Sequence, residues 1–381
     1  VSEESIKQVA SKLVRLLSVA SVHDKQSSGA LEQVYEAVGR TFPNIAEHWK
    51  ADILSSWKQS YESFDKQRSA KNNDAILAQF PSSALANAAR SVLALFTGYY
   101  KAAGQAWTDA FLSDLLSAEP KSTAEVALTC LALRVLGYAA ATGLLAQEAA
   151  MAKQLYAHVE SSNDDVRNEA AFALGCYVGN YTELLSALFD SATASTGADA
   201  SSKMMATKAA LDLAVATRRA TAIAESAWAQ VTSYVEASDK PVPDVIAQIL
   251  ATFVTAFPDV YIPLLASRIA SSNSITAKVS FITAFRTVLA DKHLSSQCDV
   301  QTKLVLPTIL ARISDADINV RRLTLLALYT LIQTKLELVE DIIPAIQPAL
   351  FQQTVIDTSV VREISMGPFK RKIDDGLETR K

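Results

Sequence analysis

The residues whose types and spacing could do chemistry gather near the C-terminal end, and the chemistry they favour is binding. Met366 and Phe369 flank the dipeptide Gly367-Pro368, and a short basic run follows. Glycine readily takes the positive φ of the first central position in a type II′ turn, and proline supplies a φ of about −65° at the second. The sequence therefore predicts a β-hairpin that turns at Gly367-Pro368.

Folding the segment about this turn gives the hairpin two different faces. The predicted partners are Met366 with Phe369, Ser365 with Lys370, Ile364 with Arg371, Glu363 with Lys372 and Arg362 with Ile373. Because side chains alternate along a strand, one face is expected to be apolar beside two arginines. The other is expected to be polar, with Glu363 opposite Lys372. A register slip of one residue would exchange the two faces.

The apolar face needs a surface to cover it, since a lone two-stranded hairpin is marginal in water. It could pack on helices of its own chain, or it could bind a partner. In the second case the partner-binding residues are Arg362, Ile364, Met366, Gly367, Pro368, Phe369, Lys370 and Arg371. Met366 and Phe369 would be the apolar anchors, and such anchors often carry about 2 kcal/mol or more of binding energy each. Ile364 would support them, and Arg371 or Lys370 would supply the polar contact.

Patterns for catalysis, metals or cofactors are missing elsewhere. The four histidines, His23, His48, His158 and His293, are scattered, and none lies in an HExxH motif. The sequence has no CxxC pair, no GxSxG elbow and no glycine-rich phosphate loop. We therefore predict no catalytic residues, no metal site and no cofactor. The three separated cysteines, Cys130, Cys176 and Cys298, are typical of a reduced intracellular protein.

Charge gives no reason to expect a nucleic-acid or membrane partner. The formal net charge is −4, so no overall basic field would attract nucleic acid. Asp374 and Asp375 directly offset the basic run of the hairpin, which argues against a nucleic-acid or lipid patch there. The apolar run Val126 to Ala146 is about long enough to span a membrane. Arg134 lies near its centre and would be costly in lipid, so a buried helix is favoured.

The sequence before the hairpin, which must position it, has the pattern of helices. Hydrophobic residues make up 50% of the 381 residues and recur at spacings of three and four, whereas aromatic residues make up only 7%. The pattern predicts about eighteen helices, which is an all-α HEAT-repeat solenoid of about nine helix pairs. Serine, asparagine and aspartate at the breaks suit helix N-caps. The segment Ser191 to Ser202 is small and polar, and we expect a loop there.

Internal repetition supports the solenoid. Ile262-Pro263 begins a motif that returns 44 residues later at Leu306-Pro307, and Ile343-Pro344 follows after 37 more, which lies in the range of HEAT-type helix pairs. Each proline is expected at a helix start, where its missing N–H has no intrahelical role.

A second motif, Asp317 to Arg322, returns as Asp164 to Asn168. We expect its acidic residue to cap a helix, its valine to point inward and its arginine to reach an acidic residue of a neighbouring repeat. The alternative is an arginine row that binds an acidic partner. The tryptophans, Trp49, Trp57, Trp107 and Trp228, are expected to pack in the core.

The hairpin segment resembles the cullin-associated and neddylation-dissociated (CAND) family of cullin-RING ligase regulators. The residues that carry the likeness are Met366-Gly367-Pro368-Phe369-Lys370, Ile373-Asp374-Asp375-Gly376-Leu377 and Arg380-Lys381. Weaker likeness lies at Asp317 to Arg322, Ala173-Leu174-Gly175 and Val178-Gly179-Asn180. It fades before about Leu115.

This resemblance implies part of the C-terminal HEAT-repeat arch: a solenoid over 1–359, a hairpin over 360–376 and the start of a further helix over 377–381. It implies a non-enzymatic regulator, cytoplasmic and nuclear, that binds the N-terminal domain of a cullin. The hairpin would compete with the Skp-type adaptor, so that substrate-receptor modules exchange. The alternative is a HEAT scaffold of another class, transport-factor-like or phosphatase-scaffold-like, that binds through its concave helices.

Overall fold

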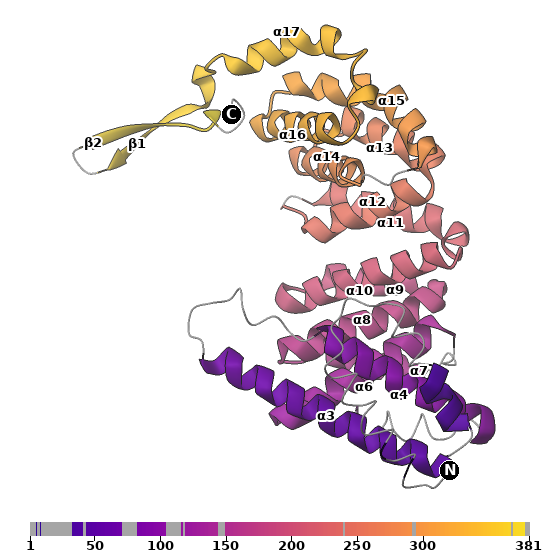
Figure 1. Cartoon of the computed structure of the whole chain (residues 1–381). Helices are drawn as coiled ribbons and strands as arrows, with labels where there is room; N and C mark the ends of the chain where they lie inside the picture. Colours follow the sequence, from indigo (N-terminus) through magenta and orange to yellow (C-terminus); the bar gives the residue numbers. More distant parts are fainter. Residues whose placement is uncertain are drawn as a thin grey trace. The chain divides into compact units, whose positions relative to one another are not determined.

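The computed structural model is built almost entirely of helices. It describes residues 5, 8, 33–40, 43–70, 82–103, 116, 119–143, 149–238, 241–291, 295–366 and 369–377. Contacts divide the chain into two compact units, Val1–Thr217 and Arg218–Lys381. Figure 1 shows the helices of each unit and a strand pair near the C-terminus. The predicted all-α class with one hairpin is confirmed.

In the first unit, the strongest packing joins helices that are two apart in the sequence. Its described helices are α3 (Pro43–Ala70), α4 (Ser82–Ala103), α6 (Thr123–Ala141), α7 (Ala149–Val159), α8 (Asp164–Asn180), α9 (Leu185–Ala194) and α10 (Gly197–Ala216). Helix α8 packs against α6 on one side and α10 on the other. Gly175 and Gly179 of α8 permit its close approach to α10. A Cβ added at Gly175 would lie 2.6 Å from the Cβ of Ala209, and one added at Gly179 would lie 2.7 Å from the carbonyl oxygen of Ala210.

Helix α6 contains most of the apolar run Val126 to Ala146. Among the described helices, it is the one whose length and composition would allow it to cross a membrane. Most of its residues are buried by protein, in contact with α3, α4 and α8. Ser122 caps it by accepting a hydrogen bond from the backbone N–H of Glu125. The structure thus agrees with the favoured interpretation of a buried solenoid helix.

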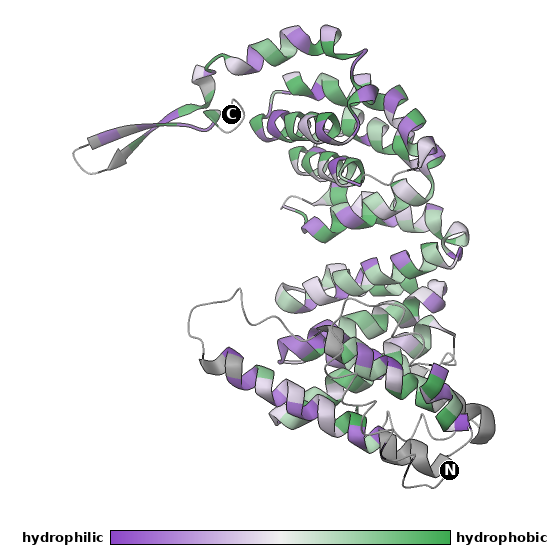
Figure 2. Ribbon diagram, in the orientation of Figure 1, coloured by the Kyte–Doolittle hydropathy of each residue, from purple (hydrophilic) through white to green (hydrophobic). Residues whose placement is uncertain are grey.

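The second unit has two layers of alternating helices. They are α11 (Ala224–Ala237), α12 (Asp244–Ala256), α13 (Pro258–Ser271), α14 (Ile275–Leu289), α15 (Ser296–Leu310), α16 (Ile318–Thr334) and α17 (Ile343–Thr354). One layer stacks α12, α14 and α16, and the other stacks α13 and α15. Figure 2 shows hydrophobic residues recurring along these helices, and many of them are buried. This alternation is the arrangement of HEAT-type helix pairs.

Two of the four tryptophans lie in the described core. Trp57 is buried and donates its indole N–H to the carbonyl of Ala127 at 2.7 Å. Trp228 is buried, and the centroid of its ring lies 4.7 Å from the centroid of the Tyr261 ring. The core prediction is confirmed for these two. The side chain of Trp49 and all of Trp107 lie outside the described residues.

Polar contacts join successive repeats of the second unit. Lys278 Nζ lies 2.9 Å from Asp315 Oδ2, and Lys303 Nζ lies 2.7 Å from Asp341 Oδ2. Lys335 likewise pairs with Asp299. Each contact spans 36 to 38 residues of sequence, which is one helix pair. These contacts align each repeat with the next.

The repeated arginine motif behaves differently in its two copies. Asp317 caps α16, Val320 is buried, and Arg321 reaches Asp357 of the next repeat at 3.2 Å, as predicted. In the earlier copy the cap is Asn163, one residue before the predicted acidic pair. There Arg167 pairs with Asp164 of its own helix, so the predicted contact between repeats was wrong in that copy.

Two further sequence expectations were wrong. Pro263 and Pro307 lie inside α13 and α15, which begin at Pro258 and Ser296, so of the three predicted prolines only Pro344 stands at a helix start. The segment Ser191 to Ser202 is mostly helical, because α9 continues to Ala194 and α10 begins at Gly197. Its alanines favour helix, and Gly197 takes the positive φ of 65° needed just after the break.

The hairpin has the predicted register. Strands β1 (Val361–Met366) and β2 (Phe369–Asp374) pair antiparallel, with Met366 opposite Phe369 and Arg362 opposite Ile373. The turn residues Gly367 and Pro368 lie outside the described residues, as do 378–381, where a further helix was expected.

Candidate protein-binding site at the C-terminal hairpin

The hairpin extends away from the helices of its own unit. Figure 1 shows β1 and β2 projecting past α16 and α17, and within the described part of the chain the two strands contact mainly each other. Ile364 on β1 is 37% exposed although it is apolar. The described residues therefore give no support to a hairpin packed on its own helices.

The structure places the predicted site residues on both strands. Arg362, Ile364 and Met366 belong to β1, and Phe369, Lys370 and Arg371 belong to β2. The register puts Ile364 opposite Arg371, as expected. The side chains of Met366, Phe369 and Arg371 lie outside the described part, so their predicted roles as anchors and polar contact stay predictions.

Ion pairs organise the charged residues of the hairpin. Lys370 Nζ lies 2.7 Å from Glu363 Oε1, a diagonal contact on the face predicted to be polar. The register places Glu363 directly opposite Lys372, the pair that the sequence indicated. The side chains of Lys370 and Glu363 are 71% and 44% exposed, so water screens the interaction and it contributes little stability. It instead orders the polar face.

Arg362 is engaged at the base of the hairpin. Its Nε lies 2.8 Å from Asp375 Oδ2. The backbone N–H of Asp375 also donates to the carbonyl of Val360 at 3.2 Å, which ties the end of β2 to the start of β1. The predicted role of Arg362 in partner binding stays a prediction, since its side chain is 63% exposed while it pairs with Asp375. The acidic residues Asp374 and Asp375 at the end of β2 were the feature of the sequence that could have indicated this ion pair.

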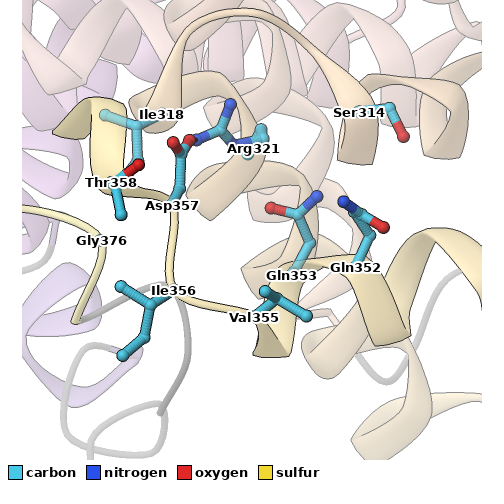
Figure 3. A pocket seen from close by; sticks show the side chains of 10 residues that line it. All are labelled: Ser314, Ile318, Arg321, Gln352, Gln353, Val355, Ile356, Asp357, Thr358 and Gly376. Carbon is cyan, nitrogen blue, oxygen red and sulfur yellow. The ribbon is translucent and has the colours of Figure 1, made fainter.

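A polar cavity of about 460 Å³ lies beside this base. Figure 3 shows Arg321 of α16 turned toward Asp357, with Gln352 and Gln353 at the end of α17. Gly376, just after β2, also lines it. The cavity therefore separates the last two helices from the segment that leads into the hairpin.

Large apolar side chains that sequence analysis did not single out are also exposed near the hairpin. Helix α17 has no buried residue, and Phe351 on it is 70% exposed. On α16, Leu326, Tyr329 and Ile332 are exposed at a spacing of three. That spacing was visible in the sequence, but it cannot distinguish an open stripe from a packed one.

The histidine, cysteine and acidic residues that the structure describes show no metal-binding arrangement. No group of three or more histidine, cysteine, aspartate or glutamate residues could hold a metal ion in this described part of the chain. His158 is buried, and its Nε2 lies 3.1 Å from the carbonyl oxygen of Leu116, which is a structural contact. The three cysteines are free and buried.

Stacked helix pairs, polar contacts between repeats and one exposed strand pair define an α-solenoid of the HEAT-repeat class. In a comparison with solved structures, the karyopherin Kap121p bound to Pho4p matches with a TM-score of 0.43 and 12% identity. The match covers 99% of this chain and 40% of that one. Kap121p bound to the C-terminus of the phosphatase Cdc14p matches with the same score and 11% identity.

Sequence comparisons find relatives for part of the chain. Residues 338–381 match the TIP120 family model, described as TATA-binding protein interacting (TIP20). Cullin-associated NEDD8-dissociated protein 1 of Drosophila melanogaster is 31% identical over 156 residues, covering 41% of this chain and 12% of that protein. The C-terminal part of the protein of the same name from Emericella nidulans is 36% identical over 124 residues, covering 32% and 12%.

These matches confirm the resemblance that the sequence indicated. Part of this chain, including residues 338–381, is similar to the CAND family. The matched region spans only about an eighth of the length of these relatives.

Proposed function

We propose that this chain is a non-catalytic regulator of cullin-RING ubiquitin ligases. It binds the N-terminal domain of a cullin, and its hairpin occupies the surface on which the Skp-type adaptor docks. Adaptor and hairpin then exclude each other. Substrate-receptor modules exchange because binding of one weakens the hold of the other.

One observation carries the proposal: the family match over 338–381 contains α17 and both strands of the hairpin. The exposure of Ile364 adds support, since an apolar side chain on a projecting hairpin suits a protein contact. The word "cullin" in the names of the relatives supplies the partner.

Competition follows from shared space. If hairpin and adaptor occupy one surface of the cullin, each reduces the affinity of the other by the same coupling free energy at equilibrium. The matched region spans about an eighth of the length of these relatives, and linked sites raise overall affinity. We therefore expect the matched region alone to bind more weakly than a full-length relative.

The direct experiment measures binding of the chain to an unmodified cullin N-terminal domain by calorimetry, with increasing amounts of Skp-type adaptor. The proposal expects the apparent dissociation constant to rise in proportion to adaptor concentration. An affinity that does not change with adaptor would contradict competition. No binding well above micromolar concentration would leave the alternative, a HEAT scaffold of another class.

A further inference from the structure

We propose that the ion pair between Arg321 and Asp357 sets the direction in which the hairpin leaves the helices. This inference rests on the proposed function for its purpose, because a hairpin must be aimed to compete for a surface. The ion pair itself lies within the second unit, where it connects α16 to the segment that leads into the hairpin, and it can be tested without any partner.

On the helix side, Arg321 is held firmly in the first turn of α16. Its Nη1 donates to the carbonyl oxygens of Asp315 and Ala316, at 3.1 and 3.3 Å. The side chain is only 13% exposed. These bonds fix the guanidinium against the turn that precedes α16, so it is a rigid support.

On the hairpin side, Asp357 lies in the short non-helical segment after α17. Arg321 Nη2 reaches its carboxylate Oδ2 at 3.2 Å. The carbonyl of Asp357 accepts a hydrogen bond from the N–H of Val360, and the carbonyl of Val360 accepts one from Asp375. A continuous series of bonds therefore runs from α16 through Asp357 to both strand ends.

The surroundings of this segment make the ion pair important. Val355 and Ile356 are 52% and 61% exposed, so apolar packing holds the segment only weakly. The cavity of about 460 Å³ lies between this segment, the first turn of α16 and the C-terminal end of α17, and the Arg321–Asp357 pair borders it (Figure 3). Without the pair, the segment has room to shift and the hairpin to change direction.

A fixed direction would raise the affinity of the hairpin for its surface. Binding costs less when the free chain already holds the bound arrangement, because less conformational freedom is lost. Arg321 and Asp357 are thus positioning residues, which need not touch the partner.

Distance distributions between two spin labels test the role of this ion pair in the free chain. Labels at Gln333→Cys on α16 and Lys372→Cys on β2 occupy exposed positions. We expect a narrow distribution in the parent and at least a doubling of its width in Asp357→Asn. The matched control is Asp341→Asn, which removes the exposed contact to Lys303 one repeat away. It should leave the distribution unchanged.

Two outcomes would overturn the inference: a distribution in Asp357→Asn that matches the parent, or equal broadening in Asp341→Asn. An unchanged urea midpoint for Asp357→Asn shows that the variant folds. The distances are measured without any partner, so failure of cullin binding would leave this inference standing. If cullin does bind, we expect Asp357→Asn to weaken binding severalfold and Asp341→Asn to leave it unchanged.

Discussion

Arg134 and Glu169 form a bidentate ion pair that joins α6 to α8. The Nε and Nη2 atoms of Arg134 donate to the two carboxylate oxygens of Glu169, each at 2.6 Å. The two side chains are only 16% and 5% exposed. The guanidinium also lies 4.4 Å from the centre of the Phe172 ring. Burial raises the pKa of Glu169, although Arg134 acts to lower it.

Removal of one partner should be costly because it leaves the other charge buried alone. We expect Glu169→Leu to lower the free energy of unfolding by about 3–5 kcal/mol, measured by urea denaturation. The double variant Arg134→Leu/Glu169→Leu should lose less than the single variant, since no unpaired charge remains. Equal losses in the two variants would contradict this account.

Gly175 should not tolerate a side chain, although alanine is a better helix former. A Cβ there would lie 2.6 Å from the Cβ of Ala209 and 2.8 Å from the carbonyl oxygen of Ala206. We expect Gly175→Ala to destabilise the protein by about 1–3 kcal/mol through overpacking. Thermal unfolding measures the loss. Unchanged or increased stability would show that α8 and α10 can separate at little cost.

Asp315 should make stability sensitive to acid. Burial acts to raise the pKa of Asp315, but Lys278, the N–H of Asp317 and Arg312 together hold it below its ordinary value. A lowered pKa gives stability that is present above the unfolded value, about 3.8, and is lost as the pH falls through the folded value. The stability difference between the parent and Asp315→Asn should therefore be larger at about pH 5 than at about pH 3. A difference independent of pH would contradict the shift.

The sequence allowed the fold class and the hairpin register to be predicted because both follow from local periodicity. Apolar spacing of three and four marks helices, and the Gly367-Pro368 dipeptide fixes which residues of β1 and β2 face each other. The residues at which helices begin and end were harder to predict. Pro263 and Pro307 were expected at helix starts, but α13 and α15 begin earlier, at Pro258 and Ser296.

Pairing choices were only partly predictable. The motif gave Arg321 a partner in the next repeat, yet the same motif left Arg167 beside Asp164. The difference depends on what the following repeat places nearby, and no local pattern contains that information. The bond from Arg362 to Asp375 was missed for the same reason, because two-strand pairing alone does not show how the base closes.

We propose that the hairpin is the part of the chain that binds the cullin. The most direct measurement is the affinity of Met366→Ala/Phe369→Ala for the cullin N-terminal domain, compared with Val300→Ala/Leu304→Ala. The control removes two side chains of α15 that are 61% and 69% exposed, outside the hairpin. We expect the hairpin variant to bind at least about tenfold more weakly and the control to bind within about twofold of the parent. A hairpin variant that binds as tightly as the parent would contradict the account.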